Sequence, residues 1–218
     1  MRRQSKFLFI LFILGWHTTV WALSSEQATV NAIQKNYESV LTFKAAFEQK
    51  AFVKMINRTE ITRGNVQIKK PGKMKWVYNS PDPQILITDQ KKLWLYTPED
   101  GQATKMPIEN VYSSNTPALF LAGQGTLTDT FDIVQVLTKK DKFVVVFTPK
   151  EAESSLSRLV LRANKNNYQI TGATVYDKLG NKTAIKFRSI RINEAIPESV
   201  FNFEVPAGVE IQDFTPSP

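Results

Sequence analysis

The chain has 218 residues, no cysteine, one histidine and a formal net charge of +8. The single histidine, His17, lies in the N-terminal segment described next, so the rest of the chain has neither histidine nor cysteine. This composition excludes Ser-His-Asp and Cys-His catalysis and nearly all zinc, copper and haem sites.

Residues 1–22 have the pattern of a cleaved signal peptide. Three basic residues precede the apolar run Phe7–Trp16, and Val20–Ala22 fits a cleavage site. The apolar run is shorter than the ~20 residues of a comfortable membrane span, although an uncleaved anchor is the alternative. No cysteine follows it, which excludes lipid attachment at a new N-terminal cysteine. We therefore expect a mature chain over residues 23–218, exported to the periplasm and soluble.

The expected mature chain is mildly basic. All three basic residues of the signal segment and none of the 20 acidic residues are lost on cleavage, so 25 basic residues remain and the net charge is +5. Such a charge suits an anionic membrane surface or an acidic partner and does not require nucleic acid. Because no linker, repeat or low-complexity tract divides residues 23–218, we expect one domain, and we take it to be monomeric.

The first elements in chain order are a helix and two strands. Ser24 and Gln27 fit a capping box, and apolar residues at helical spacing predict an amphipathic helix from Ser25 to about Val40. The period then changes to two at Phe43, Ala45 and Phe47, which predicts a strand. A second strand is predicted over Thr59–Lys70.

The next block, GNVQIKKPGKMKWVYNSPDPQILITDQKKLWLYTP (residues 64–98), is the most informative part of the chain. Met74, Trp76 and Tyr78 fall on one face of a strand, while lysines alternate on the other. Pro71-Gly72 indicates a turn or bulge. Further turns precede the apolar runs Ile85–Ile87 and Leu93–Tyr96. The block predicts a twisted antiparallel meander whose inner face carries large side chains.

Asn115-Thr116-Pro117 is typical of a helix start, and the apolar segment to Gly123 predicts a short helix, either a buried connector or a lid over a cavity. Regularly spaced strands follow, then one helical turn within Asn193–Phe203. Their predicted ranges are Phe131–Leu137, Phe143–Thr148, Leu159–Ala163, Ile170–Tyr176, Thr183–Ile192 and Phe203–Ile211. Ten or eleven strands with two or three helices indicate a mainly β (α+β) fold, one large curved antiparallel sheet with helices inside or across it.

Paired carboxylates are the remaining route to an enzyme, as in glycoside hydrolysis. The candidates Asp82, Asp89, Glu99 and Asp100 all lie in polar, turn-like contexts. We expect them to be solvated loop residues.

Four elements of the sequence carry a resemblance to a known family. They are the F-x-A-x-F run Phe43–Phe47, the block KKPGKMKWVY with PDPQILITDQKKLWLY, the segment NTPALFLA, and the closing NFEVPAGVEIQD. In this order they resemble the outer-membrane lipoprotein carrier proteins (LolA), over nearly all of the mature chain. The central block is the specific part.

The resemblance implies an incomplete, strongly curved antiparallel β-barrel with helices forming a lid over an apolar cavity. It implies a periplasmic chaperone that is not an enzyme and has no catalytic residue, metal or cofactor. This chaperone takes acylated lipoproteins from an ATP-driven (ABC-type) release complex in the inner membrane to an outer-membrane receptor. The cargo cavity would be lined by Phe43, Phe47, Met74, Trp76, Leu119 and Leu121.

Two positions depart from the family pattern. Lys70 stands where the family has an arginine that tethers the lid, so we expect a lid latch at Lys70 with fewer donors than a guanidinium offers. Met74 replaces an aromatic residue with a more adaptable side chain.

Two other functions fit the sequence. One is a periplasmic half-barrel that senses mislocalised lipoproteins and controls an envelope stress pathway. The other is a secreted module that binds anionic polymers through Lys69, Lys70, Lys73 and Lys75 around Trp76; its affinity would fall steeply with salt.

Overall fold

The computed structural model describes residues 25–89, 91–107, 127–151 and 155–215. The predicted signal peptide, its cap Ser24, and the predicted helix that follows Asn115 lie outside these residues. No helix within the described ranges is both long and apolar enough to cross a membrane.

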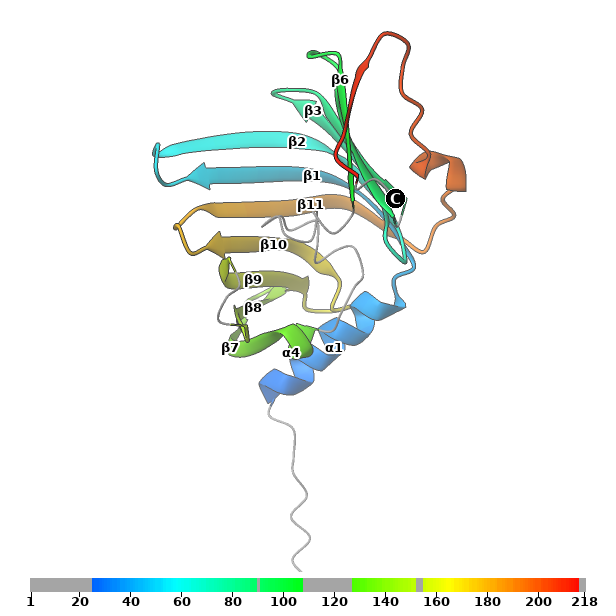
Figure 1. Ribbon diagram of the computed structural model, residues 1–218. Coiled ribbons are helices and arrows are strands. Elements are labelled where there is room, and N and C mark those ends of the chain that lie inside the picture. The colour runs from blue at the N-terminus through cyan, green and yellow to red at the C-terminus, as the bar shows by residue number, and fades with distance from the viewer. Residues whose placement is uncertain (1–24, 90, 108–126, 152–154, 216–218) are drawn as a thin grey trace, which may run out of the picture.

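The described residues form one open sheet of twelve strands (Figure 1), in the order β12-β6-β5-β4-β3-β2-β1-β11-β10-β9-β8-β7. Neighbouring strands are antiparallel except β12, which pairs in parallel with β6. The strands are β1 Thr42–Val53, β2 Arg58–Lys69, β3 Lys73–Ser80, β4 Gln84–Asp89, β5 Lys92–Thr97, β6 Gln102–Pro107, β7 Phe131–Thr138, β8 Lys142–Pro149, β9 Leu156–Asn164, β10 Ile170–Asp177, β11 Lys182–Ile192 and β12 Glu210–Asp213. The predicted mainly β fold with an open, curved sheet is confirmed.

Three helical segments accompany the sheet within the described ranges: α1 (Ser25–Ser39), the single turn α4 (Leu127–Thr130) and the 3₁₀ turn η1 (Glu198–Phe201). The predicted helix 25–40 is therefore confirmed. Its buried side chains Val30, Ile33 and Tyr37 belong to the same apolar cluster as the inward side chains of the sheet. We call the sheet face that packs against α1 the inner face.

The inner face follows from strand alternation. Phe43 of β1 lies opposite Ile68 of β2, and Ile68 lies opposite Met74 of β3. Two residues along each strand, Val66 lies opposite Trp76. Because side chains alternate between the two faces of a sheet, these residues all share the inner face, as the sequence pattern predicts.

The outer face of β4 and β5 carries a second apolar layer that the sequence pattern did not predict. Ile87 lies opposite Trp94, out of phase with the inward pair Leu86 and Leu95. The C-terminal segment covers this layer: the ring of Phe203 packs against Trp94 at 5.3 Å between centroids, and η1 lies against β3 and β4. The predicted large side chains on the inner face are confirmed, and the outer layer is an addition that was not predicted.

Two further differences concern strands. The predicted strand 203–211 is wrong, because only Glu210–Asp213 pairs with the sheet. Phe203 instead lies on the outer face. The strand β6 was not predicted, since its sequence QATKMP has weak strand character and depends on pairing with β5 for its conformation.

Candidate functional site: the inner face and its lysine contact

The central aromatic group of the inner face brings together three strands. The ring of Phe47 packs edge-on to Trp76 and to Tyr78, each at 5.1 Å between centroids, and Phe187 of β11 lies 6.5 Å from Trp76. Phe187 also packs edge-on against Phe43 at 5.2 Å. Edge-to-face aromatic pairs add stabilisation beyond their buried area, so this group is a rigid apolar wall.

Gly64 makes this aromatic group possible. It lies opposite both Phe47 on β1 and Tyr78 on β3. A Cβ added at Gly64 would come within 2.9 Å of the Phe47 ring and 1.9 Å of the carbonyl oxygen of Val77. Sequence reasoning missed this residue, although a glycine inside a strand often marks such a close approach.

Four of the predicted cavity residues are in one buried cluster. Phe43, Phe47, Met74 and Trp76 are each no more than 5% exposed. The other two, Leu119 and Leu121, lie outside the described residues. Sequence reasoning did not single out Tyr37 or Phe187, because only the folded sheet brings α1 and β11 next to Phe43.

Trp76 also carries an unused hydrogen-bond donor. Its side chain is 1% exposed, yet its indole Nε1 finds no partner among the described residues. A buried donor without a partner is costly. The polar groups near Met74 are paired: the buried hydroxyl of Thr88 donates to the carbonyl of Gly72 and accepts from the backbone N–H of Met74.

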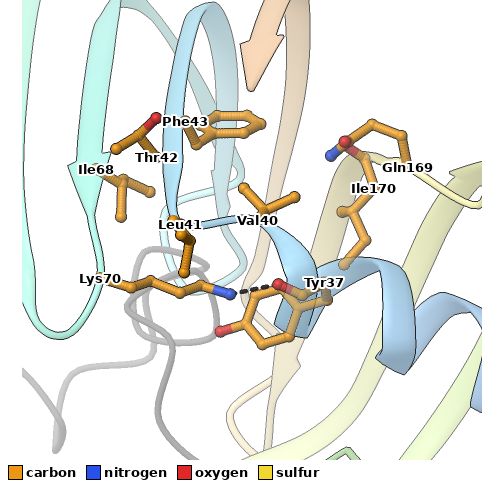
Figure 2. A pocket seen from close by; sticks show the side chains of 9 residues that line it. All are labelled: Tyr37, Val40, Leu41, Thr42, Phe43, Ile68, Lys70, Gln169 and Ile170. Carbon is orange, nitrogen blue, oxygen red and sulfur yellow. Dashed lines mark hydrogen bonds between the residues drawn. The ribbon is translucent and has the colours of Figure 1, made fainter. Parts of the chain in front are cut away.

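Beside this wall lies a small apolar pocket between α1 and the start of β1 (Figure 2). Its lining comprises Tyr37, Val40, Leu41, Thr42, Phe43, Ile68, Lys70, Gln169 and Ile170. The pocket has a volume of about 20 Å³, which is room for roughly one water molecule. Little open space therefore remains between the side chains at this junction of α1 and β1.

Lys70 connects the turn between β2 and β3 to the end of α1. Its Nζ donates a hydrogen bond to the backbone carbonyl of Tyr37 (Figure 2) and lies 3.6 Å from the centroid of the Tyr37 ring. Its backbone N–H donates to the carbonyl of Leu41 at 2.9 Å. The carbonyl of Tyr37 also accepts from the backbone N–H of Val40 at 3.4 Å. A cation at this helix C-terminus interacts favourably with the negative end of the helix dipole.

Burial changes the titration of two groups on this face. Desolvation lowers the pKa of Lys70 to about 8, against the opposing attraction of Glu38. Desolvation also raises the pKa of Tyr78 to about 12. Burial therefore disfavours the charged form of Lys70 relative to an amine in water.

The lysines around Trp76 do not form a polymer-binding platform. The Trp76 ring points to the inner face, whereas Lys69 and Lys73 lie on the outer face, where both pair with Glu198 at 2.5 Å. The alternative of a binding module centred on Trp76 is therefore wrong in its geometry. The carboxylates Asp82, Asp89, Glu99 and Asp100 are exposed, as expected, and no group of three metal-ligating side chains occurs in the part of the chain that the structure describes.

Comparison with known proteins identifies the family. The model of the outer membrane lipoprotein carrier protein LolA matches residues 38–204. The chain is 30% identical over 208 residues to the outer-membrane lipoprotein carrier protein of Legionella pneumophila (strain Corby), covering 94% of this chain and 97% of that one. It is 26% identical to the carrier protein of Nitrosospira multiformis, covering 97% and 99%.

Among solved structures, an uncharacterized conserved protein from Thermus thermophilus superposes with a TM-score of 0.56 at 10% identity, covering 87% of this chain and 99% of that one. This likeness extends to the fold alone. The family model and the full-length relatives together establish that the chain belongs to the outer-membrane lipoprotein carrier protein (LolA) family.

Proposed function

We propose that the protein is a periplasmic chaperone that carries acylated lipoproteins by burying their acyl chains against the inner face of the sheet. The observation that carries this proposal is the continuous apolar inner face of an open sheet, together with the membership of the LolA family. The role needs apolar area and a means of opening, and it needs no catalytic group.

The energetics favour a carrier that is closed when empty. Burying an acyl chain returns about 0.8 kcal/mol per CH₂, so one long chain supplies several kcal/mol. The empty pocket of about 20 Å³ cannot hold it, and part of that free energy is therefore used to separate α1 from the inner face. The opening cost lowers the net affinity, which allows a receptor to take the cargo.

The contact between Lys70 and Tyr37 is a suitable latch for this opening. It joins α1 to the β2–β3 turn beside the pocket. Breaking it exposes Phe43, Met74 and Trp76 on the inner face. In this proposal Lys70 holds the empty state closed. The inner-face aromatics then contact the cargo.

The partners follow from the same role. Residues 1–22 direct export, and residues 23–218 work in the periplasm as one domain. An inner-membrane release complex driven by ATP hydrolysis loads the carrier, and an outer-membrane receptor unloads it. Both docking steps are proposals that the family membership motivates.

A release assay tests the function. Spheroplasts with labelled lipoproteins are incubated with the purified protein, and the supernatant is probed for lipoprotein in complex with it. We expect a one-to-one soluble complex. A second carrier known to be active confirms that the release machinery works. If that control succeeds and this folded protein releases nothing, the carrier function is wrong.

A further inference from the structure

Two neighbouring hairpin turns display large apolar side chains directly to solvent. The turn between β1 and β2 carries Met55, 90% exposed, and Ile56, 59% exposed; the turn between β10 and β11 carries Leu179, 78% exposed. Both turns lie at the same end of the central strands β1 and β11, which are neighbours in the sheet (Figure 1). Most other exposed apolar side chains among the described residues are scattered, as is normal for a monomer.

The two turns are held together as one ordered unit by polar contacts. The backbone N–H of Lys54 donates to Oδ1 of Asn181 at 2.9 Å. The same asparagine donates from its backbone and its Nδ2 to the carboxylate of Asp177, at 2.8 and 2.7 Å. Gly180, with φ +87°, lies so close that an added Cβ would come within 2.6 Å of the Lys54 side chain.

This arrangement separates the shape of the turns from their apolar side chains. Asn181 and Asp177 fix the backbone, while Met55, Ile56 and Leu179 point largely into water. The fold therefore gains little from having apolar residues at these three positions. A cluster of exposed apolar side chains that does not stabilise the fold marks a candidate contact site.

Cations surround the apolar tip. Lys54 and Arg58 flank Met55 and Ile56, and Lys178 and Lys182 flank Leu179; all four are exposed. An apolar apex with a basic base matches the polarity of a bilayer surface, where apolar side chains enter the acyl boundary and cations meet anionic headgroups.

We propose that these two turns, the hairpin tip formed by residues 53–58 and 178–182, insert shallowly into the surface of an anionic lipid bilayer. The contact holds the carrier at a membrane without any bound lipoprotein. It goes beyond the proposed function and does not depend on it, since the inner face is not involved.

Cosedimentation with lipid vesicles tests the proposal. The purified protein is mixed with vesicles of phosphatidylethanolamine and phosphatidylglycerol (about 3:1) or of phosphatidylcholine alone, without lipoprotein. We expect binding to the anionic vesicles that weakens with salt. A triple variant with Met55→Ser, Ile56→Ser and Leu179→Ser should lose at least about tenfold in affinity, because full burial of one such side chain is worth about that factor.

The matched control replaces three comparably exposed apolar residues elsewhere: Val134→Ser, Ile211→Ser and Phe214→Ser, whose side chains are 57%, 52% and 61% exposed. It should bind vesicles like the wild type. A variant with Lys54→Gln and Lys182→Gln should lose about fivefold per cation and much of its salt dependence. Thermal unfolding checks that all variants remain folded.

Three outcomes would overturn the proposal: wild-type protein that ignores anionic vesicles, a triple tip variant that binds them as well as wild type, or an equal loss in the control variant. If wild type ignores vesicles but the tip variant fails to deliver lipoprotein to receptor-bearing membranes, the tip is a protein-docking surface instead.

Discussion

The two apolar faces of the central sheet are closed in different ways. The helix α1 packs against part of the inner face, and the side chain of Lys70 joins the helix to the β2–β3 turn. The outer face of β3 to β6 is covered by the C-terminal segment, which adds the strand β12, the ion pairs of Glu198 with Lys69 and Lys73, and the pair of Lys105 with Asp213.

This difference indicates which cover can move. Removing the C-terminal cover breaks backbone pairing along β12 as well as several ion pairs. Removing α1 from the inner face breaks apolar packing and the contact of Lys70 with Tyr37. Apolar packing lost on opening is restored when an acyl chain takes its place, but broken strand pairing is not. The cover of the inner face is therefore suited to displacement by an acyl chain, whereas the cover of the outer face is suited to stay in place.

The largest expected difference is between substitutions of Trp76 on the inner face and Trp94 on the outer face. Trp76→Ala should lower the free energy of unfolding by about 3–5 kcal/mol, the usual cost of removing a buried aromatic side chain, and should reduce loading with lipoprotein. Trp94→Ala, at a half-buried position on the outer face, should cost about 1 kcal/mol and leave loading intact. Urea unfolding and the release assay check both. Equal losses of stability and of lipoprotein loading in both variants would contradict the different roles of the two faces.

The next effect concerns the latch. Lys70→Leu removes a charge-assisted hydrogen bond and a cation–π contact. Together they are worth at least about 2 kcal/mol, or a factor of roughly 30 in the closed-to-open ratio. We expect tighter lipoprotein binding and slower transfer to a receptor. Lys75→Leu, on the outer face of β3, is the control. The latch is excluded if Lys70→Leu changes neither acceptance nor transfer.

A pH effect of smaller size should come from the same lysine. The pKa of Lys70 is lowered from 10.5 to about 8 by burial, so between these pH values the unfolded chain binds a proton that the folded chain does not. The free energy of unfolding should therefore increase as pH rises from about 8 to 10.5. On the way down the same contribution is lost over this range, and below about pH 8 it is absent. The difference between wild type and Lys70→Met isolates this contribution. A difference that is flat with pH would contradict the buried position of the amine.

The weakest effect is expected at the outer cover. Hydrogen bonds from Lys69 and Lys73 lower the pKa of Glu198 from 4.5 to about 2. This carboxylate stabilises the fold above pH 4.5 and loses its contribution as pH falls towards 2. Glu198→Gln should remove that part of the acid dependence with little change at neutral pH, since exposed ion pairs contribute little. A large loss of stability at neutral pH would show that the outer cover depends on this residue.

Much of the sheet was predictable from local pattern. The alternation around Phe43 and the change of period after Val40 placed α1 and β1, and the block around Trp76 placed β3 with its correct inner face. Strand β6 was not predicted because its extended conformation depends on pairing with β5 and β12. The strand 203–211 was wrongly predicted for the same kind of reason. Phe203 follows a 3₁₀ turn and packs against Trp94, a position that only the folded sheet provides.

Composition and local pattern were enough to establish that the chain lacks histidine and cysteine chemistry outside residues 1–22, that it is rich in strands, and that Met74 and Trp76 share a face. These are local properties, and they survive any arrangement of the strands. Three arrangements required the folded sheet. Gly64 makes room for Phe47, Lys70 reaches the carbonyl of Tyr37, and the turns that carry Met55 and Leu179 lie side by side. They join residues far apart in the chain, and only the pairing of β1 with β2 and β11 brings those residues together.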